Sequence, residues 1–173
     1  MSEKVVTPLF LTKEIAETAL SFVGDAIEAF HRMRRLKRQM YHIIILVPSM
    51  KDDWEAGYPD YPDYPIKPCV LAEESAGDLS EWPHRFDIVA RSKALQLWTG
   101  RNDGRTNCIP HLLFPGDTPY WGGVKRDGIV VACSGFQEHF DMMFAGMVAD
   151  ICVAMACDEK TKWMETHKDD FLP

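Results

Sequence analysis

Residues 120–135 read YWGGVKRDGIVVACSG, and this stretch decides the fold. It contains two runs suited to short strands, 120–124 and 129–134, separated by the polar residues 125–128. The Asp127-Gly128 pair supplies the positive backbone φ that a tight turn between antiparallel strands needs. The stretch therefore predicts a β-hairpin.

Helices and further strands are predicted on both sides of this hairpin. Apolar residues recur every three or four positions over 12–40, 86–98 and 138–160, which is typical of a helix with one buried face. Thr12 is suited to cap the first helix, and Gly100 to end the second. The run 42–47, HIIILV, indicates a strand covered on both faces and ended by Pro48, and 69–72 is a shorter candidate strand. The predicted fold class is α+β, with an antiparallel sheet flanked by long N- and C-terminal helices.

We expect a single domain over residues 1–173. Residues 48–68 stand out because they contain five prolines and the tandem YPDYPDYP, so they are expected to form an extended, ordered insertion. That insertion could cover a ligand, or it could hold a neighbouring subunit. The charged tail, 158–173, is expected to be peripheral.

Composition excludes several classes of protein. The chain has 46% hydrophobic and 26% charged residues, which is ordinary for a globular domain. Its net charge of -7 argues against nucleic-acid binding, and no apolar run approaches the ~20 residues of a membrane span. The start, MSEKVVTPLF, resembles no secretory signal, and the five cysteines form no CxxC pair. We therefore expect a cytoplasmic protein with reduced thiols and no membrane or nucleic-acid partner.

Two segments resemble a known family. Residues 90–95, ARSKAL, are similar to the "A-x-x-K-A-x-T-A" helix segment of the GlcG/HbpS family, which includes the C-terminal domain of PduO proteins. The series GGV (122–124), DGIVVA (127–132) and SG (134–135), followed by Asp141, resembles the closing "GG…dGxvvGaigvSG…D" segment of that family. The resemblance covers about residues 88–155. It implies a profilin-like fold, assembly into homo-oligomers, and haem or a related tetrapyrrole as a possible cofactor.

The chain also departs from the family pattern. Val47-Pro48 and the Tyr-Pro-Asp insertion replace the family's segment after its first strand. Trp98 stands where the family has a small or polar residue, and Cys133 where it has a small one. Ligand contacts in those regions cannot be carried over. The chain is therefore interpreted as a divergent member that could take a different ligand.

Lys93 and His139 are the titratable candidates for a ligand-binding site. Lys93 lies on an otherwise apolar helix, where it could point into a cleft and bind a carboxylate, or extend along the helix to solvent. His139 lies at the start of the last helix beside Glu138 and Asp141, where it could bind an anion, ligate haem or move protons. Alternatively His139 is simply exposed, and Asp141, which matches the family pattern, is interpreted as stabilising the helix end.

Trp121, Gly122 and Gly123 combine an aromatic surface with glycines that would let a planar ligand approach the backbone. The alternative is packing at a strand end followed by a turn. His111 precedes the hairpin and could complete the same pocket. No histidines have metal-ligand spacing, so no metal site is expected, and the sequence holds no P-loop, HExxH or GxSxG motif.

These observations predict a small-molecule-binding domain in a homo-oligomer, with haem as a possible ligand. Its expected ligand-binding residues are Lys93, His111, Trp121, Gly122, Gly123 and His139. The alternative is a cofactor-independent isomerase or lyase acting on a small organic acid, with Lys93 or His139 as acid or base. A third possibility is a structural subunit that grips its neighbour with the Tyr-Pro-Asp loop.

Overall fold

The computed structural model describes residues 5–51, 66–102, 110–170 and 172. Within them the chain forms an α+β fold with a five-stranded antiparallel sheet, which confirms the predicted class and is consistent with a profilin-like fold. The elements, in chain order, are β1 (Val5–Val6), α1 (Lys13–Arg32), β2 (Tyr41–Lys51), β3 (Lys67–Ala76), α2 (Phe86–Trp98), β4 (Gly123–Arg126), β5 (Ile129–Ser134) and α3 (Glu138–Thr166), with short 3₁₀ turns at Leu79–Glu81 and Pro110–Leu112.

Strand β2 is the centre of the sheet. It pairs with β3 on one side and β5 on the other, β4 pairs with β5, and β1 pairs with the far end of β2. The register places His42 opposite Ser75 on β3 and opposite Ser134 on β5. Three side chains from three strands are thereby brought to one end of the sheet.

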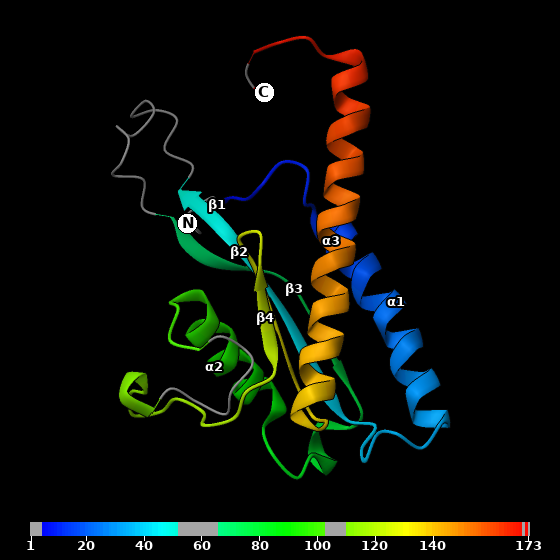
Figure 1. Cartoon of the computed structure of the whole chain (residues 1–173), viewed down its shortest axis with the longest axis vertical. Coiled ribbons are helices and arrows are strands. Elements are labelled where there is room, and N and C mark those ends of the chain that lie inside the picture. The colour runs from blue at the N-terminus through cyan, green and yellow to red at the C-terminus, as the bar shows by residue number, and fades with distance from the viewer. Residues whose placement is uncertain (1–4, 52–65, 103–109, 171, 173) are drawn as a thin grey trace.

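Both faces of the sheet are covered (Figure 1). Helices α1 and α3 lie side by side on one face, and α2 covers the other. Alternate residues of β2 therefore belong to different cores: Ile43, Ile45 and Val47 pack with α1 and α3, whereas Ile44 and Leu46 pack with α2. The prediction of a strand buried on both faces is confirmed.

The predicted hairpin is present, with a shorter turn than expected. Strand β4 begins at Gly123 and continues to Arg126, so Asp127 and Gly128 alone make the turn, with φ of 47° and 88°. Helix α2 also ends as predicted, because Gly100 follows it with a φ of 73°. Strand β3 is longer than the predicted 69–72.

Helix α1 ends at Arg32, so the prediction of a helix to residue 40 was wrong. Thr12 caps its start as expected. At its end, Arg34 adopts a φ of 55°, the Arg34 N–H donates to the His31 carbonyl, and the Arg35 N–H donates to the Phe30 carbonyl. This is the Schellman arrangement that glycine usually closes, and an arginine in its place gave no sequence signal.

Strand β2 continues through Pro48 to Lys51, which corrects the predicted end at Pro48. The ladder with β5 stops at Leu46, so the missing N–H of Pro48 removes no hydrogen bond from that side. On the other side Pro48 lies opposite Pro68. The centre of the predicted insertion, 52–65, lies outside the described residues.

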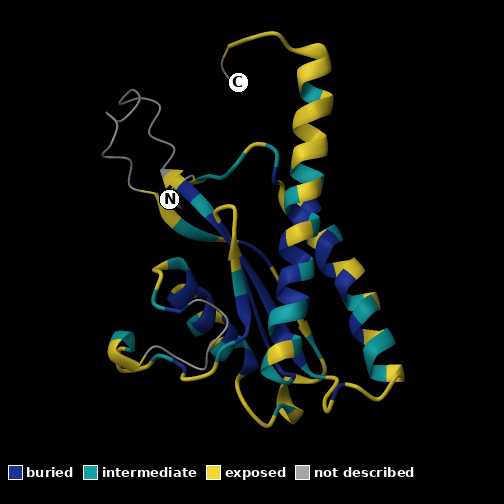
Figure 2. Cartoon of the chain, in the orientation of Figure 1, coloured by how far each residue is buried: buried dark blue, intermediate teal, exposed yellow. Residues whose placement is uncertain are grey.

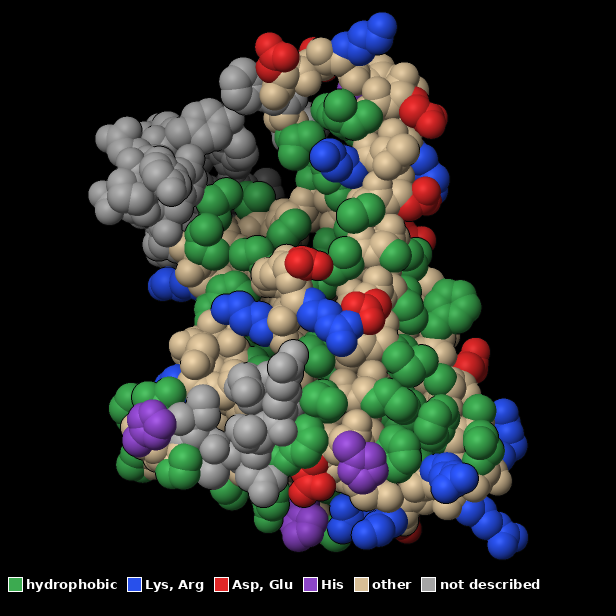
Figure 3. Space-filling view, in the orientation of Figure 1, with side chains coloured by type: hydrophobic (Ala, Val, Ile, Leu, Met, Phe, Trp, Pro, Cys, Tyr) green, Lys and Arg blue, Asp and Glu red, His purple; other side chains and the backbone are tan. Residues whose placement is uncertain are grey.

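Helix α3 extends to Thr166, beyond the predicted 160, and much of its second half is exposed (Figure 2). It is the one helix among the described residues that is long and apolar enough to cross a membrane, although its buried face packs in the core. Acidic and basic side chains are interspersed over the face of the molecule shown in Figure 3. Cys69, Cys133, Cys152 and Cys157 are free thiols, and Cys108 lies outside the described residues.

Candidate functional site

Lys93 is fully buried and paired with a carboxylate of this chain. It lies on the face of α2 that packs on the sheet, between Ala90 and Ala94, whose small side chains bring the helix close to β5. Its Nζ lies 2.9 Å from Asp141 Oδ2 and donates to the Cys133 carbonyl at 2.8 Å. Only 2% of Lys93 is exposed, so the predicted alternative of a side chain reaching solvent is not observed.

Asp141 joins this ion pair to the start of α3. Its Oδ1 accepts a hydrogen bond from the Phe136 N–H at 3.0 Å, just before the helix begins. One oxygen thus supports the helix end, as the sequence suggested, while the other binds Lys93. Burial raises the pKa of Asp141 to about 6, and the Lys93 ammonium and the Phe136 N–H limit that rise.

Gly122 is the third part of this cluster. It has a φ of 127°, and a Cβ built there would lie 2.6 Å from Asp141 Cβ and 3.1 Å from Lys93 Nζ. A Cβ on Gly123 would lie 2.7 Å from Leu97 Cδ1. The two glycines therefore make room for the protein's own side chains, which is the packing alternative considered for this pair.

A pocket of about 190 Å³ opens beside the ion pair. Phe86, Phe136 and Tyr120 supply rings, while Arg38, His84 and Glu138 add polar groups. The Arg38 guanidinium lies 5.9 Å from the centre of the Phe86 ring and donates to the Gly135 carbonyl at 3.5 Å. We call this cavity the Lys93 pocket; Val89, Lys93, Ser134, Gly135 and Asp141 complete its lining.

The expected site residues are brought together only in part. Lys93 and Gly122 meet at Asp141, and Gly123 adjoins them in sequence but packs on Leu97. The other three expected residues do not line the Lys93 pocket. Trp121 is half-buried, His111 is exposed in the turn Pro110–Leu112, and His139 is exposed on α3.

Sequence reasoning missed Arg38 and Phe136 as parts of this pocket. The predicted helix 12–40 includes Arg38, but in the structure Arg38 lies in the segment between α1 and β2. Phe136 reaches the pocket because the chain turns at Gly135, which has a φ of 141°. A Cβ on Gly135 would lie 2.3 Å from the Met40 carbonyl oxygen, so only glycine fits this turn. The Ser134-Gly135 pair was the signal available for the turn.

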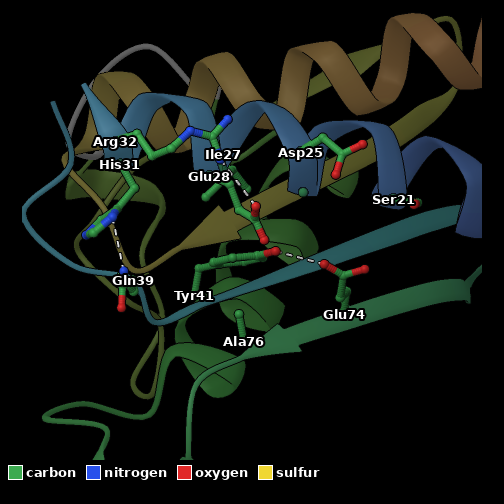
Figure 4. A pocket seen from close by; sticks show the side chains of 11 residues that line it. Ser21, Asp25, Ile27, Glu28, His31, Arg32, Gln39, Tyr41, Glu74 and Ala76 are labelled. Carbon is green, nitrogen blue, oxygen red and sulfur yellow. Dashed lines mark hydrogen bonds and ion pairs between the residues drawn. The ribbon is translucent and has the colours of Figure 1, made fainter. Parts of the chain in front are cut away.

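A second pocket, of about 570 Å³, lies between α1 and the strands β2 and β3 (Figure 4). Tyr41 donates to Glu74 Oε1 at 2.8 Å, and Gln39 Nε2 lies 3.0 Å from His31 Nδ1. Burial raises the pKa of Tyr41 above its ordinary value. These bonds join lining residues to one another, and none of the residues expected to bind a ligand lies there. We therefore take the Lys93 pocket as the candidate site.

Haem, which the family resemblance implies, does not fit the Lys93 pocket. Sites that enclose drug-sized ligands occupy about 300–1,000 Å³, and this pocket is smaller at about 190 Å³. Its one histidine, His84, is exposed and has its ring 6.2 Å from that of Phe86. The described lining suits a ligand much smaller than a tetrapyrrole.

Comparison of the chain with protein-family models, with curated proteins and with solved structures found no match.

Proposed function

We propose that this protein is a small-molecule-binding domain that takes a small organic acid, aromatic or aliphatic, in the Lys93 pocket. The observation that supports this proposal best is the Lys93–Asp141 ion pair, 2% exposed at both residues, in the lining of a pocket. Taking two charges out of water costs several kcal/mol per ion before their attraction repays it. Well-packed apolar residues are often as stable as a buried ion pair, so we interpret a pair kept beside a cavity as serving binding rather than folding alone.

The lining suits a carboxylate attached to a flat or apolar body. Arg38 offers a planar guanidinium at the rim, which matches the geometry of a carboxylate. Phe86 and Tyr120 provide ring surfaces for the rest of the ligand. Glu138 adds a negative charge to the same lining, so a monocarboxylate with a polar or cationic second group is favoured over a polyanion.

Calorimetric titration with a panel of small aromatic and aliphatic carboxylic acids tests this proposal. We expect at least one acid to bind, its neutral amide to bind at least about tenfold more weakly, and Arg38→Met to abolish the difference. Arg34→Met, which changes an exposed arginine outside the pocket, is the matched control and should bind like the wild type. If none of the acids binds, the proposal is contradicted. If titration with haem shifts the Soret band, a tetrapyrrole is the ligand instead.

An enzyme acting on such an acid is the second candidate, because Asp141 lines the Lys93 pocket and burial raises its pKa. A carboxyl with a pKa of about 6 is suited to exchange protons near neutral pH. If Asp141 is the acid or base of an isomerase or lyase, acids that bind should also be converted, and Asp141→Asn should stop conversion. NMR of the ligand detects conversion. If the acids bind but are not converted, the protein is a binding protein and not an enzyme.

We also propose a cytoplasmic homo-oligomer. Less than half of the most apolar window of α3 is buried within one chain, at 39%. We infer that a second copy of this chain, rather than a membrane, buries the exposed apolar surface of α3. Light scattering after size exclusion should give a mass above the 19.7 kDa of one chain, and a monomer at all concentrations would contradict this. If the Tyr-Pro-Asp loop binds the neighbouring subunit, deletion of residues 58–65 should also disrupt that assembly.

A further inference from the structure

A serine, a histidine and a glutamate meet on the α2 side of the sheet, in a cluster separate from the residues lining the Lys93 pocket. The register of β2 with β3 places His42 directly opposite Ser75. Glu73 precedes Ser75 by two residues, so both side chains leave the same face of β3. The antiparallel ladder therefore brings the three groups together without a motif that is visible in the sequence.

One of the two contacts of the His42 ring is a hydrogen bond, and the other is a carboxylate lying beside the ring. Ser75 Oγ lies 2.7 Å from His42 Nδ1. On the other side of the ring, His42 Nε2 lies 3.5 Å from Glu73 Oε2 and has no hydrogen-bond partner among the described residues. His42 is 3% exposed, whereas Ser75 is exposed at the open edge of the sheet.

The surroundings keep the imidazole neutral and orient it. Burial lowers the pKa of His42, while Glu73 and Asp87 oppose that shift and Arg91 adds to it. Arg91 Nη2 donates to both oxygens of Glu73, at 2.8 and 2.6 Å, which holds the carboxylate beside the ring. A carboxylate next to Nε2 favours the tautomer with its proton there. Nδ1 is then the acceptor for the Ser75 hydroxyl.

We propose that Ser75 is an activated nucleophile that accepts the acyl group of small, unhindered esters, with His42 as its general base. The Ser75 Oγ–acyl carbon bond forms as the bond from that carbon to the alkoxide or phenoxide breaks. The Ser75 proton passes to His42 Nδ1 and then to the departing oxygen, so charge and atoms balance. Glu73 is a positioning residue, because it acts through His42.

Acetylation by p-nitrophenyl acetate tests the proposal, with peptide mapping to find the modified serine. Ser80 is an internal control, since it is also exposed but its hydroxyl donates to Asp78 and contacts no imidazole in the described structure. We expect Ser75 to be acetylated about 100-fold faster than Ser80, as a general base provides. Ser75→Ala should remove that adduct, and His42→Gln should lower the Ser75 rate to that of Ser80.

Glu73→Gln separates positioning from a merely structural effect. Glu73 raises the pKa of His42, so its removal should move the acidic limb of the pH–rate profile for Ser75 to lower pH. Equal acetylation of Ser75 and Ser80, or a Ser75 rate unchanged in a folded His42→Gln variant, would overturn the proposal. Circular dichroism of each variant establishes that it is folded.

Discussion

Lys93 is among the largest of the fully buried side chains in the described residues, and its apolar and charged parts have different roles. Its aliphatic stem fills the apolar stripe of α2, while its ammonium reaches Asp141 on α3. The charge is satisfied by the Asp141 carboxylate and the Cys133 carbonyl. Removing either partner leaves the other charge buried, which is the costly state.

Replacement of Lys93 by methionine keeps the stem and removes the charge. We expect Lys93→Met to lower the free energy of unfolding by ~3–5 kcal/mol, because Asp141 loses its ion-pair partner in the core. The double variant Lys93→Met/Asp141→Asn should recover at least ~1 kcal/mol of that loss. Urea unfolding measures the free energy of unfolding of both variants. Lys160→Met, at an exposed position of α3, is the control. A single variant as stable as the wild type would contradict the prediction.

Gly122 and Gly128 both have positive φ, but only Gly122 is packed. Gly128→Ala meets open space, so it should cost only the backbone strain of ~1–2 kcal/mol. Gly122→Ala also places a side chain at positive φ, and in addition it drives a methyl group against Asp141, so it should cost at least ~2 kcal/mol more than Gly128→Ala. If thermal unfolding shows equal destabilisation of the two variants, the prediction is contradicted, because the Lys93–Asp141 cluster would then accommodate the added methyl group.

At the scale of an element, the end of α1 determines where the pocket residue Arg38 lies. The helix stops because Arg34 takes a left-handed conformation, and the segment 33–40 then turns toward the sheet. Apolar periodicity continues past this point in the sequence, yet Met33 is exposed. The hydrogen bonds at the helix end override the pattern.

Glycine should suit the left-handed position at Arg34 better than arginine does. We expect Arg34→Gly to stabilise the protein by ~0.5–1 kcal/mol, because glycine adopts positive φ without strain. Arg35→Gly, one residue later and without positive φ, should have no such benefit and should cost stability through chain entropy. Denaturant unfolding of the two variants side by side gives the comparison, and the opposite order would refute the assignment of the helix end.

At the scale of the whole molecule, the buried carboxyl of Asp141 couples stability to pH. Its folded pKa of about 6 lies above its ordinary value of 3.8. Between these pH values the folded protein holds a proton that the unfolded chain has released. Asp141 therefore adds stability as the pH falls through 6, and costs stability at higher pH.

The matched variant Asp141→Asn removes this linkage. The free energy of unfolding of the wild type, relative to Asp141→Asn, should increase as the pH is lowered from about 7 to about 4. Carbon-13 NMR of the Asp141 carboxyl should show its midpoint near 6. A midpoint below the ordinary value, with the opposite change in relative stability, would mean that Lys93 dominates over burial.

The sequence by itself determined the α+β class, the hairpin with its Asp127-Gly128 turn, and the presence of helices before the first long strand, between the strands and after the hairpin. These features follow from local periodicity and turn chemistry, which are encoded within a few residues. The sequence also singled out Lys93 and the double glycine, but it did not show what Lys93 binds.

Only the tertiary structure decided which groups meet. Lys93 and Asp141 are 48 residues apart, and His42 and Ser75 are 33 apart. The first pair depends on how α2 and α3 pack at the end of β5, and the second on the register of β2 with β3. A shift of that register by one residue would turn Ser75 to the other face, and no local pattern specifies such a pairing.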